Sequence, residues 1–195
     1  MVIVLVAGFG AFLDVTDNPS ARLATSLDGR TATLPDGRTL RIVGRDMPVS
    51  YARGPDLVAA QARQIGAAAV LGIGVARGRA APMLETTGRR TLEPSLADVD
   101  GVRLADLGAL QAGPEVVTTT WPVAPFVAGS GFGTSEDAGS YVCNAWLWRT
   151  TQLLPDRPVG FLHIPDGGAD AEALLRGIVA SLGVKSGSAG KPDRP

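Results

Sequence analysis

The residues best suited to covalent chemistry in this 195-residue chain are its single cysteine, Cys143, and its single histidine, His163. A thiol becomes an effective nucleophile when a neighbouring imidazole takes its proton and later returns it. Cys143 precedes a predicted helix over 144–154, and the positive end of a helix favours a thiolate. The alternative is an inert core residue, because free cysteine is among the most buried residue types.

His163 lies near the end of a predicted buried strand, 20 residues after Cys143. That separation leaves room for one helix and a return to the sheet, so the two side chains can lie on adjacent parallel strands at one sheet edge. A satisfied buried histidine is the competing interpretation of His163.

An imidazole base is usually oriented by a carboxylate or an amide, and spacing alone does not select one of the 19 acidic residues. Glu85 is attractive because it follows the loop at 74–79 and has an apolar neighbourhood. The competing interpretation places Glu85 on the surface of an edge strand.

The elements that must position these residues alternate between strands and helices. Apolar runs at 2–7, 68–73 and 159–165 are typical of strands buried on both faces of a parallel sheet. A hairpin is predicted within 29–45, and helices are predicted at 19–27, 55–65, 144–154 and 169–182. In the second helix, Leu57 and Val58 are expected on the buried face. The pattern predicts one α/β domain with a mainly parallel, twisted sheet over residues 1–185, followed by a flexible tail at 186–195.

Composition excludes several functional classes. The chain is 45% hydrophobic and 19% charged with a net charge of −1, so we expect no nucleic-acid or membrane partner. One cysteine and one histidine exclude an internal disulfide and a Cys/His zinc cluster, and we expect no metal or cofactor. The glycine-rich turns at 8–13 and 72–77 lack the third glycine of a dinucleotide-binding loop. The N-terminus has no basic targeting region, so a cytoplasmic location is expected.

Two motifs around the candidate residues are specific. Residues 138–144 read Ala-Gly-Ser-Tyr-Val-Cys-Asn, and residues 160–165 read Gly-Phe-Leu-His-Ile-Pro. They are close to Ala-Gly-Thr-Phe-Val-Cys-Asn and Gly-Phe-Ile-His-Val-Pro of the pyroglutamyl peptidase I (pyrrolidone-carboxylate peptidase) family of cysteine peptidases, in the same order. The similarity extends from residue 2 to about 182 and includes 8–12, 18–20, 47–49, 74–85 and 113–123.

The resemblance implies a single α/β/α sandwich that removes N-terminal pyroglutamate from peptides. It implies Cys143 as the nucleophile, His163 as general base and then acid, and Glu85 as the group that orients the imidazole. Backbone N–H groups at the start of the Cys143 helix would stabilise the oxyanion. Family members often form dimers or tetramers, so a homo-oligomer is compatible with the resemblance.

The resemblance also implies a small pocket for the pyrrolidone ring. Its expected wall residues are Phe9, Phe12, Tyr141 and Val142, because a planar lactam suits aromatic walls with a few hydrogen bonds. Val75 occupies the position at which the family usually has Gln, and we include it among the substrate-binding residues.

Some surroundings of the motifs depart from the family. The arginine that usually follows the catalytic glutamate is Thr86, the stretch 135–137 reads Ser-Glu-Asp, and the family's cleft-lining insertion is shortened within 91–112. The first hypothesis is therefore a pyroglutamyl peptidase. The alternatives are a divergent thiol hydrolase of another small amide or ester, and a non-catalytic binding protein on the same scaffold.

Overall fold

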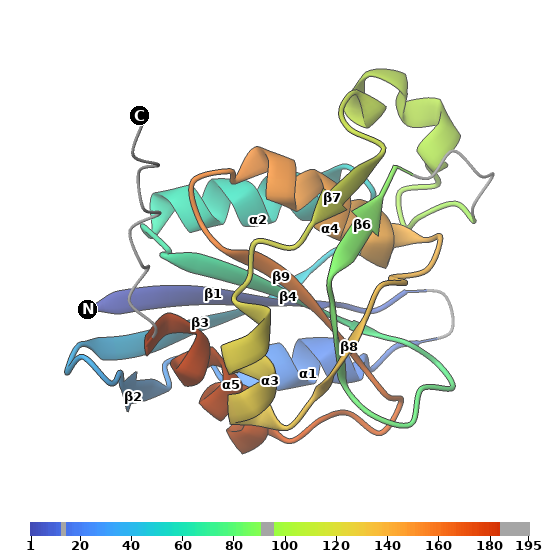
Figure 1. Cartoon of the computed structure of the whole chain (residues 1–195). Coiled ribbons are helices and arrows are strands. Elements are labelled where there is room, and N and C mark those ends of the chain that lie inside the picture. Colours follow the sequence, from blue (N-terminus) through green and yellow to red (C-terminus); the bar gives the residue numbers. More distant parts are fainter. Residues whose placement is uncertain (13–14, 91–95, 184–195) are drawn as a thin grey trace, which may run out of the picture.

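A seven-stranded sheet forms the centre of the molecule (Figure 1). This computed structural model describes residues 1–12, 15–90 and 96–183. The strand order is β2-β3-β1-β4-β9-β5-β8; β3, β1, β4 and β9 are parallel, whereas β5 runs antiparallel to β9. The strands are β1 (Val2–Phe9), β2 (Thr31–Thr33), β3 (Thr39–Met47), β4 (Ala69–Val75), β5 (Met83–Glu85), β8 (Gly133–Ser135) and β9 (Val159–Ile164).

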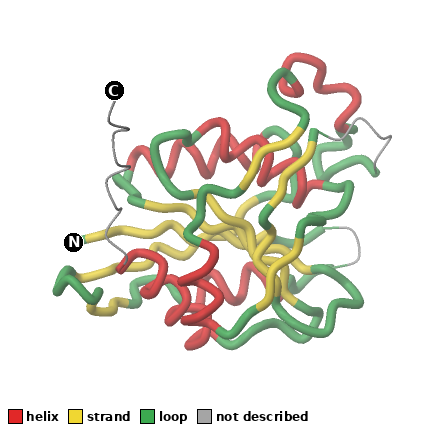
Figure 2. The backbone as a smooth tube through the Cα atoms, in the orientation of Figure 1, coloured by secondary structure: helices red, strands yellow, loops and turns green. Residues whose placement is uncertain are grey.

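Helices cover both faces of this sheet and give three layers (Figures 1 and 2). Side chains alternate along β1, so that Val4 and Val6 join one core and Leu5 and Ala7 the other. The first core lies under α1 (Pro19–Ser26), α3 (Val123–Ser130) and α5 (Ala171–Gly183); the second lies under α2 (Arg53–Gln64) and α4 (Val142–Leu153). The predicted single-domain α/β fold with a mainly parallel sheet is confirmed, while the predicted tail at 186–195 lies outside the described residues.

Helix α1 approaches the sheet closely and fixes the loop after β1. A Cβ added to Gly8 would lie 2.0 Å from the backbone oxygen of Ser20, so this contact requires glycine. Asn18 caps the helix by accepting from the Ser20 N–H at 3.0 Å. Its Nδ2 donates to the Gly10 carbonyl at 2.9 Å, and Ser20 Oγ donates to the Phe9 carbonyl at 2.9 Å. The residues that cap α1 therefore also hold the turn at Phe9 and Gly10 in place.

A small antiparallel ribbon stands beside α4, at the upper right of Figure 1. It pairs β6 (Thr87–Arg89) with β7 (Val116–Thr118), and a kinked 3-10 segment (Leu104–Gln111) precedes β7. The buried Asn144 side chain fastens the ribbon to α4, because its Oδ1 accepts from the Arg89 N–H at 2.8 Å and its Nδ2 donates to the Arg89 carbonyl at 2.7 Å.

Two local predictions were wrong. Leu57 is 52% exposed, because Val58, Ala59 and Ala62 form the buried face of α2. The segment that contains Glu85 is not an edge strand: β5 lies between β9 and β8. Within the described ranges, none of the helices is long and apolar enough to cross a membrane.

Candidate active site

The thiol of Cys143 lies in the first turn of α4. The helix begins at Val142, and Tyr141 at the N-cap makes no side-chain cap. The first N–H groups of a helix have no partner within it, so this turn presents donors near the thiol. The expectation of adjacent strands was wrong: the preceding strand, β8, is separated from β9 by β5, and a turn rather than a strand leads into Cys143.

A glycine brings the thiol and the imidazole to one face of the sheet. A Cβ placed on Gly74 would lie 3.0 Å from Cys143 Sγ and 2.8 Å from the Phe161 ring, so Sγ packs directly over this backbone. Gly74 is paired with His163 on the neighbouring strand β9. Neighbouring strands are about 4.8 Å apart, and Phe161, two residues before His163, projects from the same face of β9. The thiol and the imidazole therefore occupy one small region.

The His163 imidazole is held by Glu85. The distance from His163 Nδ1 to Glu85 Oε1 is 2.7 Å, and the two side chains are 5% and 0% exposed. An ionised carboxylate can only accept a hydrogen bond, so Nδ1 carries the proton and Nε2 is left as the acceptor of the ring. Phe161 packs edge-on to the imidazole with the ring centroids 5.1 Å apart. This is the arrangement of a general base with its orienting carboxylate.

The direction of β5 explains why Glu85 is fully buried. Because β5 runs antiparallel to β9, Met83 pairs with His163 and Glu85 pairs with Phe161, deeper in the sheet. On the other side β8 covers the strand, with Glu85 paired to Ser135. The carboxylate therefore lies below the imidazole and away from solvent, rather than on the surface.

An arginine that the sequence did not assign completes the contacts of Glu85. Arg79 Nη1 lies 2.8 Å from Glu85 Oε1. Its Nη2 donates to the Asp137 carbonyl at 2.7 Å and to Ser135 Oγ at 3.1 Å. Arg79 lies within the 74–85 segment that resembles the family, six residues before Glu85.

Burial controls the ionisation of the Cys143 thiol. Desolvation raises the pKa of the Cys143 thiol to about 12, and the negative charge of Glu85 acts in the same direction. The backbone N–H of Cys143 and the charge of Arg79 lower this pKa, but their effect is smaller. Desolvation therefore outweighs the two contacts that favour the thiolate.

Three of the five predicted substrate-binding residues line one cavity of about 330 Å³. These are Phe12, Tyr141 and Val75; the other lining residues are Val15, Pro19, Arg77, Leu96 and Asp166. Val142 and Phe9 are instead buried in the core between the sheet and α2 and α4. Tyr141 links this cavity to the thiol, because it lines the cavity and lies two residues before Cys143 in the chain. Cys143 and His163 are not among the lining residues, and Val75 packs against the opposite core from Cys143.

Tyr141, which lines this cavity, packs against the buried Tyr51. The rings of Tyr51 and Tyr141 meet edge-on with centroids 5.6 Å apart. The hydroxyl of Tyr51 donates to the Leu96 carbonyl at 3.0 Å, and the hydroxyl of Tyr141 donates to the Ala97 carbonyl at 3.0 Å. Desolvation raises the pKa of Tyr141, which keeps this hydroxyl a donor. The pair thus anchors the segment that carries Leu96.

Comparison with known proteins identifies the family of this chain. The family model described as pyroglutamyl peptidase matches residues 2–171. The chain belongs to the pyroglutamyl peptidase family. A pyrrolidone-carboxylate peptidase of Halalkalibacterium halodurans is 30% identical over 173 residues, which cover 84% of this chain and 83% of the relative. One of Cupriavidus taiwanensis is 29% identical over 175 residues, covering 85% and 79%. The predicted family and its enzyme class, a cysteine omega peptidase, are confirmed.

Solved structures share the fold. A mutant pyrrolidone carboxyl peptidase from the hyperthermophile Pyrococcus furiosus superposes with a TM-score of 0.78 at 22% identity, covering 92% of this chain and 98% of that chain. The enzyme from Thermococcus litoralis gives 0.74 at 20% identity, covering 93% and 92%. This chain therefore has the same α/β sandwich fold as the solved structures.

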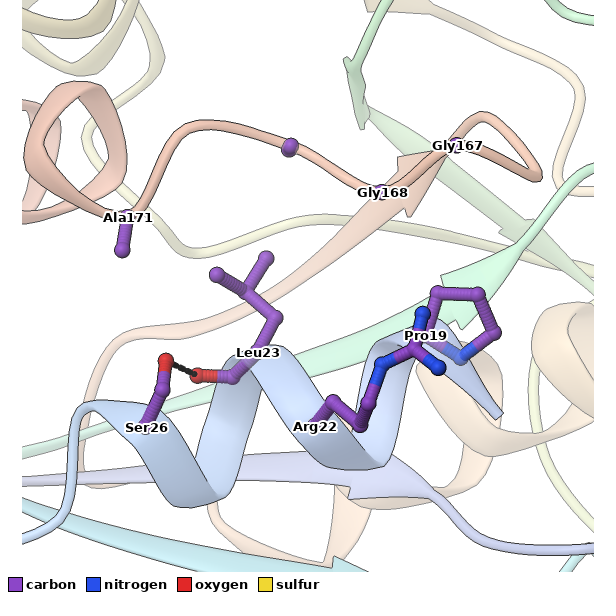
Figure 3. Close-up of a pocket in the computed structure, with 8 residues that line it drawn as sticks. Pro19, Arg22, Leu23, Ser26, Gly167, Gly168 and Ala171 are labelled. Atoms are coloured by element: carbon purple, nitrogen blue, oxygen red, sulfur yellow. Dashed lines mark hydrogen bonds between the residues drawn. The ribbon is translucent and has the colours of Figure 1, made fainter. Parts of the chain in front are cut away.

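A second, shallower cavity of this family member lies between α1 and the loop before α5 (Figure 3). It has a volume of about 260 Å³ and contains none of the predicted site residues. Its charged lining residue, Arg22, pairs with Asp17. Pro19 lines both cavities, so the two are neighbours across the start of α1.

Proposed function

We propose that this protein is a cysteine peptidase that removes N-terminal pyroglutamate from peptides, with Cys143, His163 and Glu85 as its catalytic residues. The observation that carries the proposal is the 2.7 Å contact between His163 Nδ1 and Glu85 Oε1, next to a thiol that packs over the strand residue paired with His163. A buried carboxylate that orients an imidazole beside a thiol is the arrangement that acyl transfer requires.

The first half of the reaction transfers the pyroglutamyl group to the enzyme. As Cys143 Sγ attacks the carbonyl carbon of the scissile amide, His163 Nε2 takes the thiol proton. The N–H groups in the first turn of α4 are suited to bind the oxyanion that forms. His163 then gives its proton to the leaving nitrogen, so that the C–N bond breaks and the shortened peptide leaves with a free amine.

The second half releases the acid. Water attacks the thioester carbonyl while His163 takes a proton from it, and the C–S bond breaks. The proton returns to sulfur, which regenerates the thiol, and pyroglutamate leaves. The reaction as written needs only these side chains, backbone N–H groups and water, and no cofactor.

The cavity that Tyr141 lines suits a small lactam. Phe12 and Tyr141 supply aromatic surface and Val75 supplies an aliphatic wall. A volume of about 330 Å³ is at the small end of the range for ligand pockets, as a ring with one attached residue requires. We place the pyrrolidone ring here. We also place the enzyme in the cytoplasm, where a reducing environment keeps the thiol free.

Hydrolysis of a fluorogenic pyroglutamyl amide tests this function. The wild type should release the fluorophore, and Cys143→Ala should lose turnover while its thermal unfolding remains close to that of the wild type. Wild-type turnover by Cys143→Ala would overturn the proposed mechanism.

A second candidate function is hydrolysis of another small amide or ester by the same thiol. It is favoured by Val75, which replaces the amide side chain that the family usually has at this position with an apolar one. Parallel assays with pyroglutamyl, prolyl and ester substrates separate the two candidates. Preference for a substrate without a lactam would favour the second.

A further inference from the structure

Arg79 contacts two parts of the active site at once. It lies in the loop after β4, and its side chain is 23% exposed, beside a Glu85 side chain that is fully buried. One end of the guanidinium, Nη1, pairs with the carboxylate that orients His163, and the other end, Nη2, binds the segment 135–137. A planar guanidinium can make such divergent contacts because its donors have a fixed geometry.

The first contact supplies a countercharge that the reaction needs. His163 alternates between neutral and protonated forms in the proposed mechanism, so Glu85 must remain a buried anion even when the imidazole is neutral. An unpaired buried charge costs several kcal/mol. Glu85 Oε2 has no hydrogen-bond partner among the described residues, so the contacts at Oε1 are the ones that hold the group. Arg79 Nη1 also has no hydrogen-bond partner among the described residues, so its contact with Oε1 is an ion pair that supplies charge, while the hydrogen bond with His163 Nδ1 orients the carboxylate.

The second contact reaches the turn that leads to the nucleophile. Arg79 Nη2 donates to the Asp137 carbonyl, and the Asp137 side chain accepts from the Gly139 N–H at 2.9 Å. Ser135 Oγ accepts from the Asp137 N–H at 3.1 Å, which closes the turn. Gly139 has φ of 78°, a left-handed conformation that suits glycine. The turn therefore has a defined shape four residues before Cys143.

We propose that Arg79 is a positioning residue that sets the base and the nucleophile in a fixed relation, by holding Glu85 at one end of its guanidinium and the 135–139 turn at the other. It touches neither the substrate nor the reacting atoms. This inference rests on the proposed peptidase function. It predicts that the loss of Arg79 lowers the rate of the chemical step more than the affinity for substrate.

The test compares Arg79→Ala and Arg79→Lys with Arg30→Ala. Arg30 is a matched control because it forms an ion pair of 2.7 Å with Glu172, at the start of α5. We expect kcat of Arg79→Ala to fall about 100-fold with little change in KM, since a small misplacement of reacting groups has effects of this order. Arg79→Lys should be intermediate, because an ammonium is a single point charge that cannot make both contacts. Arg30→Ala should keep the wild-type kcat.

Chemical rescue separates positioning from folding. Added guanidinium or methylguanidine should restore part of kcat in Arg79→Ala at concentrations that do not unfold the variant. The same additives should not restore kcat in Glu85→Ala. Wild-type kcat in Arg79→Ala overturns the inference, as does a loss of kcat that follows thermal instability and resists rescue.

An assay that needs no substrate turnover separates a failure of this inference from a failure of the proposed function. If the wild type hydrolyses no pyroglutamyl substrate, the proposed function fails, and the role of Arg79 is measured by alkylation of Cys143 with iodoacetamide. Arg79→Ala should then lower the alkylation rate at pH 8, and His163→Ala is expected to lower it as well. An alkylation rate equal to that of the wild type would overturn the positioning role.

Discussion

The chemistry of Cys143 depends on proton transfer at the moment of attack. A thiol with a pKa of about 12 has only about one molecule in ten thousand as thiolate at pH 8. A preformed thiolate–imidazolium pair is therefore not the resting state. The buried imidazole, with its Nδ1 proton committed to Glu85, can accept the thiol proton as the S–C bond forms.

The pH dependence of alkylation tests this description. In the wild type, His163 can take the thiol proton as iodoacetamide reacts, so Cys143 should be alkylated readily at pH 8. In His163→Ala the rate at pH 8 should fall. The rate should then increase only toward pH 12, because the raised pKa keeps the thiol protonated until its own titration. Mass spectrometry of the single thiol provides the measurement.

Glu85→Gln is a useful companion variant in this experiment. The amide is nearly isosteric but carries no charge, so it should retain the fold and weaken the assistance from His163. Equal profiles in the wild type and in His163→Ala would mean that the imidazole does not reach the thiol, and would contradict the proposed triad.

Substitution of Gly74 tests the packing of the Cys143 thiol on β4. A Cβ at this position would lie 2.8 Å from the Phe161 ring and 3.0 Å from Cys143 Sγ. We therefore expect Gly74→Ala to displace the thiol, to lower kcat by about tenfold or more, and to destabilise the protein by about 1–3 kcal/mol through overpacking. Enzyme kinetics and urea unfolding measure the two effects.

Gly10→Ala is the matched control for Gly74→Ala. A Cβ on Gly10 meets nothing closer than 3.5 Å, which is an ordinary contact. Its stability should remain within about 0.5 kcal/mol of the wild type. If Gly74→Ala behaved like Gly10→Ala in both assays, the close packing of the thiol on β4 would be wrong.

At the scale of elements, α4 is the helix whose position matters most in the proposed mechanism, since it carries Cys143 and the first-turn N–H groups. Its inner face packs on the sheet through Val142, Trp146 and Leu147, which are fully buried. Its outer side is fastened to β6 by the paired hydrogen bonds between Asn144 and the Arg89 backbone. The ribbon therefore acts as a brace for the catalytic helix.

Removal of this brace has a measurable effect. Asn144→Ala would leave the Arg89 N–H and carbonyl without this partner, so we expect a loss of about 1–3 kcal/mol in the free energy of unfolding. Activity should fall as well, because the next residue toward the N-terminus is Cys143. Gln64→Ala, at the exposed end of α2, should change neither quantity. An active and fully stable Asn144→Ala would exclude the bracing role.

The sequence predicted long elements well and short ones poorly. β1, β4 and β9 were recognisable as continuous apolar runs, and α1 by its Asn18 cap followed by Pro19. The burial of Glu85 was not predictable, because a three-residue strand has no periodicity and its direction depends on its neighbours. Arg79 was missed for a different reason: its contacts with the 135–137 segment join parts of the chain more than 50 residues apart, although Glu85 is only six residues away.

At the scale of the whole molecule, one sheet supplies both cores. Trp121 lies in the core under α1, α3 and α5, and Trp146 lies in the core under α2 and α4. Because residues on opposite faces of β1 and β4 belong to different cores, neither core can lose its packing without exposing the sheet. The two halves should therefore unfold together.

Variants that keep a single tryptophan test this coupling. One variant keeps Trp121 and the other keeps Trp146, with the remaining tryptophans changed to Phe. In each variant, the urea midpoint from fluorescence should equal the midpoint from far-UV circular dichroism, as for two-state unfolding. A fluorescence midpoint that precedes the dichroism midpoint in one variant would mean that its core melts separately.

The late position of β9 in the chain has a consequence during synthesis. His163 and Glu85 are 78 residues apart, and β9 inserts between β4 and β5 to complete the sheet. A nascent chain that ends before residue 159 already contains Cys143 but has neither the imidazole nor the strand that supports Glu85. Since domains fold as units as they leave the ribosome, we expect the proposed site to be assembled only after β9 has been synthesised, and chains that end before β9 to be inactive.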